Sequence, residues 1–161
     1  MAAVFLICGK ICSGKSTLAQ KLAKESSAVI LSCDEIMTLF PQPEGDEAYA
    51  AVSEKVKACL LNKAAQIASC GANVILDWGF WRRKERAEIS AFFAENQIPF
   101  TWYYLDIPDS AWRENIARRN ARPGPSDYFV DEGLLQKCIR RFETPGEEET
   151  RGWRIVGRHR D

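Results

Sequence analysis

A chain of 161 residues that is 46% hydrophobic and 27% charged has the composition of an ordinary globular protein, and its length suits a single domain. Lys and Arg total 22, as do Asp and Glu, so no overall positive charge would attract nucleic acid or an anionic membrane. The longest apolar run near the start, residues 2–8, is too short to cross a bilayer and lacks the basic flank of a signal peptide. We therefore expect one domain over residues 1–161, located in the cytoplasm, that binds neither nucleic acid nor a membrane.

The first half of the chain alternates strand-like and helix-like segments, which is typical of a parallel sheet covered by helices. The apolar run at 2–8 predicts a central strand, and apolar residues at helical spacing predict a helix over 16–24. A second strand is expected over 28–33. A short helix over 34–40 should end at a loop rich in proline and glycine, before a long helix over about 47–70.

The second half continues the same alternation and ends in a weak strand. The expected elements are a strand over 72–77, a helix over 84–95, a strand over 99–106, helices over 109–120 and 130–142, and a strand over 152–157. Residues 121–127, "ARPGPSD", form a loop between the last two helices, and 158–161 are expected to fray. This order of elements predicts an α/β fold.

Six cysteines form no disulfide or zinc pattern. No C-x-x-C pair occurs, and the only histidine is His159, in the basic tail. Free thiols of a reducing compartment are the simpler interpretation. Cys12 and Cys33 adjoin candidate site residues, but we expect packing residues there in preference to redox groups.

The stretch from Gly9 to Ser16 fits G-x-x-x-x-G-K-[ST] and lies between an apolar strand and an amphipathic helix, which is the context of a phosphate-binding P-loop. Lys15 is expected to reach the β- and γ-phosphates of ATP, and the Ser16 hydroxyl to ligate Mg²⁺. Lys10 fills an unspecified position and its side chain is expected to be solvated. The expected nucleotide-binding residues of this loop are Gly9, Lys10, Ile11, Cys12, Ser13, Gly14, Lys15, Ser16 and Thr17.

Two aspartates follow apolar strands and are candidates for chemistry. Ligands of such folds bind at the carboxyl ends of the parallel strands, where Asp34 and Asp77 are expected. Asp77 resembles the Walker B aspartate that supports Mg²⁺, which leaves Asp34 as the base that accepts the proton of a hydroxyl nucleophile. The opposite allocation is equally compatible with the sequence, and either residue could instead cap the following helix.

A group of arginines leads into the loop at 121–127: Arg113, Arg118, Arg119 and Arg122. Arg118, Arg119 and Arg122 are expected to bring positive charge to a transferring phosphoryl group when this segment closes, with Arg118 contacting the nucleotide. The alternative is a solvated helix face. A further arginine, Arg86, follows the third strand, where substrate contact and plain surface charge are alternatives. The aromatic residues Trp78, Phe80 and Trp81 either line a substrate pocket or belong to the core.

Together these features resemble the small P-loop kinases of the nucleoside-monophosphate-kinase-like group. The nearest resemblance is to the AAA_33 family of ATP-binding proteins, related to polynucleotide kinase, zeta toxins and chloramphenicol phosphotransferase. It rests on "LICGKICSGKSTLAQKLA", Asp34, "VILDWGFWRRKER", "RENIARRNARPGPSD" and "FETPGEEE". The loop departs from the commoner form at residues 10–12, where small residues or proline often stand.

The resemblance implies a P-loop NTPase fold with a five-stranded parallel sheet in the order 2-3-1-4-5, helices on both faces and a small lid at about 121–127. It implies that Asp34 activates the substrate, that Arg86 lies on the substrate side, and that Arg119 and Arg122 are lid arginines. We also expect Asp77 to lie beside the substrate.

The function expected is an ATP-dependent phosphotransferase that moves the γ-phosphate of Mg-ATP to a hydroxyl of a small-molecule acceptor. A GTPase is disfavoured because no N-K-x-D motif follows the fourth strand. A polynucleotide 5′-end or nucleoside kinase and a non-catalytic ATP-binding or NTP-hydrolysing module remain alternatives. The expected partners are ATP and the acceptor, with the chain a monomer or homodimer, and the sequence does not identify the acceptor.

Overall fold

The computed structural model describes residues 2–41, 43–124 and 129–157. Within them the strands are β1 (Val4–Gly9), β2 (Ala28–Ser32), β3 (Asn73–Gly79), β4 (Phe100–Leu105) and β5 (Arg154–Val156). The helices are α1 (Lys15–Ser26), α2 (Cys33–Met37), α3 (Asp46–Ser69), α4 (Arg83–Glu95), α5 (Asp109–Ala121) and α6 (Glu132–Arg141). Every element expected from the sequence is present, with bounds that differ by one to three residues at most ends.

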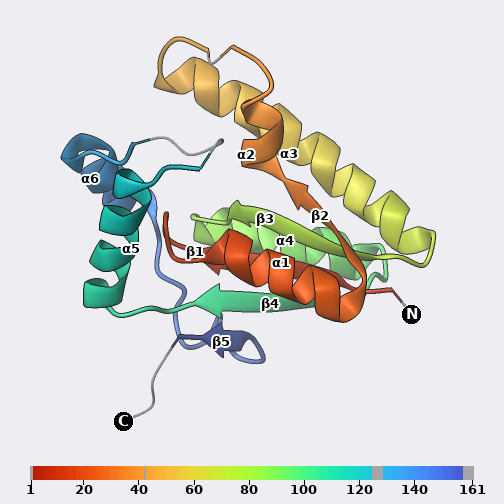
Figure 1. Ribbon diagram of the computed structural model, residues 1–161. Helices are drawn as coiled ribbons and strands as arrows, with labels where there is room; N and C mark the ends of the chain where they lie inside the picture. The colour runs from red at the N-terminus through yellow and green to blue at the C-terminus, as the bar shows by residue number, and fades with distance from the viewer. Residues whose placement is uncertain (1, 42, 125–128, 158–161) are drawn as a thin grey trace.

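The five strands form one sheet in the order β2-β3-β1-β4-β5, and every neighbouring pair is parallel. This confirms the α/β class and the strand order of a P-loop NTPase. Strand β1 lies at the centre of the sheet, with Val4 opposite both Val74 of β3 and Phe100 of β4. The carboxyl ends of β1 and β4 point toward α5 (Figure 1). The loop that follows β1 therefore lies at the end of the sheet that faces α5.

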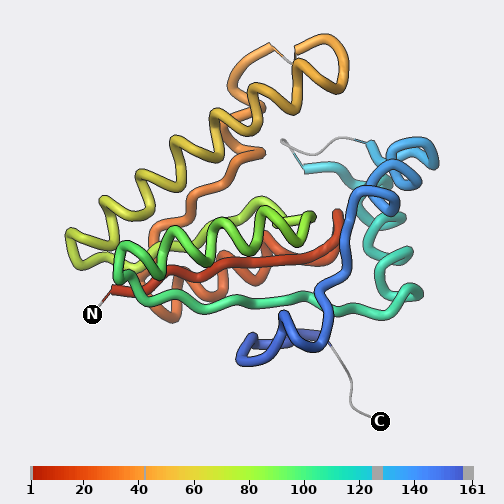
Figure 2. The backbone as a smooth tube through the Cα atoms, turned by 180° about the vertical axis from the view of Figure 1, so that it is seen from behind, coloured from red at the N-terminus to blue at the C-terminus, as the bar shows by residue number. Residues whose placement is uncertain are grey.

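The two faces of the sheet bury different sets of side chains, because successive residues of a strand point to opposite faces. On one face Ile7 packs with Ala19 and Leu22 of α1. On the other, Val4 and Leu6 join the core that α3 and α4 cover. Helices thus lie on both faces, with α1 in front of the sheet in Figure 1 and α4 in front of it in the reverse view of Figure 2.

A third, smaller core lies beyond the carboxyl end of the sheet. Ile11, in the loop after β1, packs there with Trp112 and Ile116 of α5 and Leu135 of α6. Trp112 is only 3% exposed and Ile11 only 4%. Through this core the phosphate-binding loop is packed directly against two helices that are distant in sequence.

The structure corrects three details of the sequence prediction. Strand β3 continues beyond the predicted end, through Gly79, because Gly79 still pairs with Cys8 of β1. A bulge precedes this pair, since β3 has one more residue than β1 between the pairs Leu6–Leu76 and Cys8–Gly79. Helix α6 begins at Glu132, two residues later than predicted, because Asp131 caps it by accepting a hydrogen bond from the Leu134 N–H. Helix α5 ends at Ala121.

The remaining expectations concern the cysteines, membrane-spanning segments and the segments at 121–127 and 158–161. All six cysteines are free, as predicted, and burial raises the pKa of Cys8 to about 12, so its thiol is unreactive. Among the described residues, no helix combines the length and apolar character needed to cross a membrane. The predicted lid at 121–127 lies partly outside the described residues, and the tail at 158–161 lies wholly outside them.

Candidate functional site

The P-loop connects β1 to α1, and a side chain at either of its two glycines would disturb the loop. A Cβ at Gly9 would lie 2.6 Å from the Ser13 hydroxyl oxygen, so a side chain there would displace that hydroxyl. Gly14 precedes α1 with a φ of 97°, a left-handed conformation that glycine adopts without strain. The loop therefore has the tight turn and helix N-terminus of a phosphate site.

Lys15 begins α1 and its side chain reaches back across the loop. Its Nζ donates to the Lys10 carbonyl oxygen at 2.7 Å, an oxygen that also accepts from the Ser13 backbone N–H at 3.3 Å. Burial lowers the pKa of Lys15, and the negative charges of Asp77 and Asp34 oppose that shift. Phosphate oxygens, which carry full negative charge, would compete with the Lys10 carbonyl for this ammonium.

Asp77 and Ser16 are joined across the site. The Ser16 hydroxyl donates to Asp77 Oδ2 at 3.0 Å, although 61 residues separate them in sequence. Asp77 is 6% exposed, and burial raises its pKa, against the opposing effects of Lys15 and the Ser16 hydrogen bond. A buried carboxylate beside a serine hydroxyl supplies the oxygen ligands that Mg²⁺ prefers.

The Ser13 hydroxyl also fits a bound nucleotide. It is buried within the loop and has no hydrogen-bond partner among the described residues, as expected of a group that meets a phosphate oxygen. Magnesium in kinases is held by few protein ligands together with the substrate phosphates, which suits Ser16 and Asp77.

Asp34 lies in the first turn of α2, directly after β2. Ser32, and not Asp34, caps this helix, because its hydroxyl accepts from the Glu35 N–H at 3.3 Å. Asp77 lies within β3 and caps no helix either, since the residue before α4 is Arg82. The capping alternative is therefore wrong for both aspartates. Asp34 is exposed, and its charge acts on the pKa of both Lys15 and Asp77, which places it near the phosphate site.

One face of α5 holds the outer side of the P-loop. The Trp112 indole N–H donates to the Ile11 carbonyl at 2.6 Å, and the Asn115 amide donates to the Cys12 carbonyl at 3.1 Å. One turn further on, Arg119 Nη1 lies 3.3 Å from Cys12 Sγ. The sequence indicated Arg119 but not Trp112 or Asn115. Their only signal in the sequence is that they share one helix face with Arg119, at helical spacing.

The other predicted arginines are placed differently. Arg118 is exposed on the last turn of α5, and Arg122 is exposed where the helix ends, with a φ of −142°. Arg119 and Arg122 would share a helix face only if α5 continued to Arg122, and it does not. The structure therefore brings Arg119 alone of these three into a hydrogen bond with the P-loop.

Arg86 is buried in an ion pair. It is 1% exposed, and its Nε and Nη2 donate to the two carboxylate oxygens of Glu149 at 2.6 and 3.1 Å. Its Nη1 donates to the Phe80 carbonyl at 2.9 Å, just beyond the end of β3. A direct contact between Arg86 and an acceptor, which the family resemblance implied, would require this pair to open.

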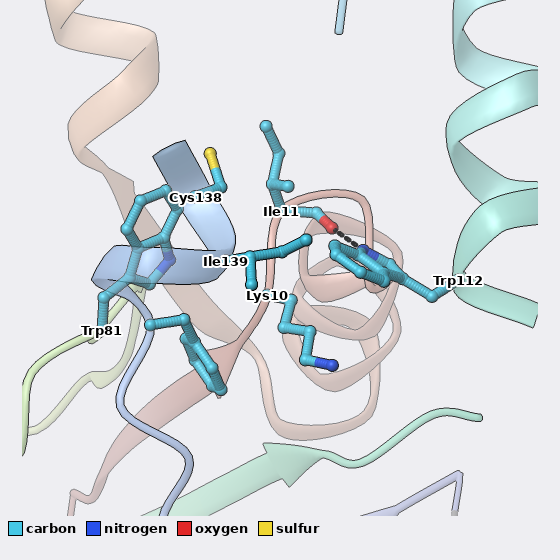
Figure 3. Close-up of a pocket in the computed structure, with 7 residues that line it drawn as sticks. Lys10, Ile11, Trp81, Trp112, Cys138 and Ile139 are labelled. Carbon is cyan, nitrogen blue, oxygen red and sulfur yellow. Dashed lines mark hydrogen bonds between the residues drawn. The ribbon is translucent and has the colours of Figure 1, made fainter. Parts of the chain in front are cut away.

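The aromatic residues after Asp77 do not gather in one pocket. Phe80 is fully buried and Trp78 is 9% exposed, both in the core between the sheet and its helices. Trp81 lines a small cavity of about 10 Å³, enough for about one water molecule, between the P-loop, α5 and α6 (Figure 3).

Lys10 lines the same cavity, and its ammonium lies 4.6 Å from the Trp112 ring and 3.5 Å from Asp109. Its side chain is therefore paired, where the sequence predicted solvation.

Comparison with known proteins agrees with this geometry. Residues 4–145 match the AAA_33 family, described as an AAA domain. The chain belongs to the AAA_33 family. No curated protein sequence matches it.

Solved structures with the same fold include kinases. A gluconokinase from Sinorhizobium meliloti 1021 is 17% identical with a TM-score of 0.63, covering 96% of this chain and 82% of its own. A sugar kinase from Janibacter sp. HTCC2649 is 19% identical with a TM-score of 0.67, covering 98% and 86%. Chaetomium thermophilum Kti12, in complex with ADP-AlF3, is 16% identical with a TM-score of 0.72, covering 96% and 88%. This AAA_33 chain thus has the fold of small P-loop kinases.

Proposed function

We propose that the protein is an ATP-dependent phosphotransferase that moves the γ-phosphoryl group of Mg-ATP to a hydroxyl of a small-molecule acceptor. The observation that carries the proposal is the separation of two carboxylates around one P-loop. Asp77 is buried and bonded to Ser16, whereas Asp34 is exposed at the end of the neighbouring strand. Nucleotide binding needs only the first, and a second carboxylate that caps nothing is available as a base.

In the proposed reaction the acceptor hydroxyl attacks the γ-phosphorus. A new bond forms between this oxygen and phosphorus, the bond from phosphorus to the bridging oxygen breaks, ADP leaves, and the hydroxyl proton passes to Asp34. Lys15 leaves the Lys10 carbonyl and contacts the phosphate oxygens, while Arg119 supplies charge beside the P-loop. Magnesium, held by Ser16 and Asp77, would supply neutralisation of the charge that develops on the phosphates.

The charge around Asp34 favours an acceptor that is not itself an anion. We name residues 33–54 the acceptor arm; it comprises α2, the following loop and the first turns of α3. The arm contains neither Lys nor Arg. Its six carboxylates belong to Asp34, Glu35, Glu44, Asp46, Glu47 and Glu54. Asp46 is paired with Lys137 and Arg141 of α6, and Glu54 with Lys57, so the negative charge of the arm comes mainly from its other carboxylates. This charge disfavours a phosphorylated acceptor or an oligonucleotide end, and a neutral or cationic alcohol is the better match.

The acceptor is sought by measuring ATP consumption and phosphorylated products across sugars, antibiotics, nucleosides and oligonucleotide ends. Transfer to a small neutral or cationic alcohol would support the proposal. Transfer only to oligonucleotide ends would identify a polynucleotide kinase. ATP binding without transfer to any member of the panel, or hydrolysis alone, would favour the non-catalytic or NTP-hydrolysing alternative.

The role of Asp34 is tested with a pair of variants that each remove one exposed carboxylate. A positioned base contributes about 10²–10⁴-fold in rate, so Asp34→Asn should lower kcat by that factor and leave ATP affinity unchanged. Glu88→Gln, on the exposed face of α4 and outside the acceptor arm, should keep the parent's kcat. Melting temperatures should be alike, because Ser32 caps the helix. Full turnover in Asp34→Asn would contradict the assignment and direct attention to Asp77.

A further inference from the structure

Helix α5 packs against the P-loop through the helix face that carries Trp112 and Asn115. Figure 3 shows Trp112 pointing at the loop, with its bond to the Ile11 carbonyl drawn as a dashed line. Asn115, almost one turn along the helix, bonds the next carbonyl, that of Cys12. Two consecutive carbonyl groups of the loop are therefore each bonded to one side chain of α5.

The direction of these carbonyls fixes the direction of the adjacent N–H groups. The described peptide bonds are all trans, so in each peptide unit the C=O and the following N–H point in opposite directions. With the Ile11 and Cys12 carbonyls turned toward α5, the N–H groups of Cys12 and Ser13 are turned away from it. The Ser13 N–H indeed donates across the loop to the Lys10 carbonyl, at a long distance of 3.3 Å.

Cys12 itself has a conformation that needs support. Its φ of 56° lies in the left-handed region, which residues other than glycine adopt at a steric cost. The residue lies between the two carbonyls that α5 holds, and Arg119 contacts its Sγ. Trp112 is itself fixed, because it is 3% exposed and has the Lys10 ammonium over its ring.

We propose that Trp112 and Asn115 are positioning residues for the nucleotide. By holding the Ile11 and Cys12 carbonyls toward α5, they keep the N–H groups of Cys12 and Ser13 on the inner side of the loop before the polyphosphate binds. The Ser13 N–H then exchanges the Lys10 carbonyl for a phosphate oxygen. The loop is then already ordered when the nucleotide binds. Binding therefore does not include the entropic cost of ordering the loop, and the affinity is higher. This inference rests on the nucleotide site of the proposed function and is independent of phosphoryl transfer.

The test removes each hydrogen-bond donor separately and keeps an aromatic side chain at position 112. In Trp112→Phe the indole and its N–H are replaced by a smaller phenyl ring, and Asn115→Ala removes the second donor. The packing lost at position 112 is matched by the control. The matched control is Trp102→Phe on β4, which is also 3% exposed and loses a bond of the same kind, from its Nε1 to Ser90 Oγ at 3.0 Å. Each variant is titrated with Mg-ADP by calorimetry without any acceptor, and its melting temperature is recorded.

One hydrogen bond to a neutral group is worth roughly a factor of ten in an equilibrium constant, so Trp112→Phe and Asn115→Ala should each weaken ADP binding by about 5- to 10-fold. The double variant should weaken it further, by about 30-fold or more. Trp102→Phe should lose a similar amount of thermal stability to Trp112→Phe and yet bind ADP within about twofold of the parent.

The proposal is overturned if Trp112→Phe and Asn115→Ala both bind ADP as tightly as the parent, because α5 would then only pack against the loop. If Trp112→Phe does not fold, the half-buried Asn115 carries the test alone. A parent protein that binds no ADP would also overturn it. A parent that binds ADP but transfers no phosphate would overturn the phosphotransferase and leave this inference standing.

Discussion

The phosphate site and the acceptor arm lie at the same end of the sheet and are built in opposite ways. We call the P-loop (residues 9–17), the end of β3 and α5 the phosphate end. Here the side chains between the loop and α5 are buried, as the 4% exposure of Ile11 and the 3% exposure of Trp112 illustrate. On the acceptor arm, by contrast, Leu39 is 68% exposed and Tyr49 is 40% exposed, although Cys33 and Met37 of α2 are buried.

Charge separates the two regions as clearly as burial does. The phosphate end combines the Lys15 ammonium, the α1 N-terminus and Arg119 with the Asp77 carboxylate, whereas the charged residues of the acceptor arm are all Asp or Glu. Burial, and then the charge of Asp34, raise the pKa of Tyr49, so these two side chains are close on the arm. A fixed phosphate end suits a constant ligand, the nucleotide, and a more exposed arm suits closure around an acceptor.

The largest expected effect concerns the ion pair beneath the phosphate end. Glu149→Ala leaves the Arg86 guanidinium buried without its carboxylate, and breaking a buried pair in this way costs about 3–5 kcal/mol of the free energy of unfolding. Chemical denaturation measures the loss, and Glu148→Ala, an exposed neighbour, should change it by less than about 0.5 kcal/mol. Equal stability of the two variants would show that the phosphate end does not depend on this pair.

The second prediction is the loss of nucleotide affinity in Lys15→Ala. Hydrogen bonds to charged groups are worth about 1.5–3 kcal/mol, so ATP affinity should fall by about 10- to 100-fold. Calorimetry with Mg-ATP measures it, and Lys21→Ala, on the exposed side of α1, should keep the parent's affinity. The parent should also prefer ATP to GTP. Undiminished affinity in Lys15→Ala would remove the basis for calling this end a phosphate site.

The third prediction separates transition-state stabilisation from simple nucleotide anchoring. Arg119→Ala should lower kcat by about 10-fold or more and change KM for ATP much less, because its charge acts on the developing negative charge. Arg122→Ala should act in the same direction with a smaller effect, since Arg122 is exposed at the end of α5. Arg113→Ala, on the exposed face of α5, is the control. A rise in KM with kcat unchanged would make both arginines nucleotide anchors.

The smallest expected effect lies on the acceptor arm. Leu39→Ser removes an exposed side chain and should change the free energy of unfolding by less than about 0.5 kcal/mol. If the arm receives the acceptor, the same change should raise the acceptor KM by about 3- to 10-fold, because burying one apolar side chain against a ligand is worth about 1 kcal/mol. KM for ATP should not change.

The control for this variant is Val29→Thr on β2, which alters a residue that is 44% exposed but outside the arm. Identical acceptor KM values in both variants would show that the arm does not receive the acceptor. The contrast between the two regions would then concern stability alone.

The sequence by itself determined the elements and the nucleotide half of the site. Apolar runs and helical spacing are local patterns, so they placed every strand and helix to within a few residues. The P-loop is equally local, because Gly9, Gly14, Lys15 and Ser16 lie within eight consecutive residues and the backbone between them forms the cradle. The strand order came from the resemblance to P-loop kinases, since spacing alone does not order a parallel sheet.

Only the tertiary structure decided which side chains meet. It paired Arg86 with Glu149 across 63 residues, and so buried a residue for which the sequence left substrate contact and surface charge open. It brought Trp112 and Asn115 to loop carbonyls 101 and 103 residues away, and ended α5 before Arg122. Such contacts depend on how helices pack over a finished sheet. Local sequence patterns do not predict these contacts, because Arg86, Trp112 and Asn115 each look like ordinary residues of a helix.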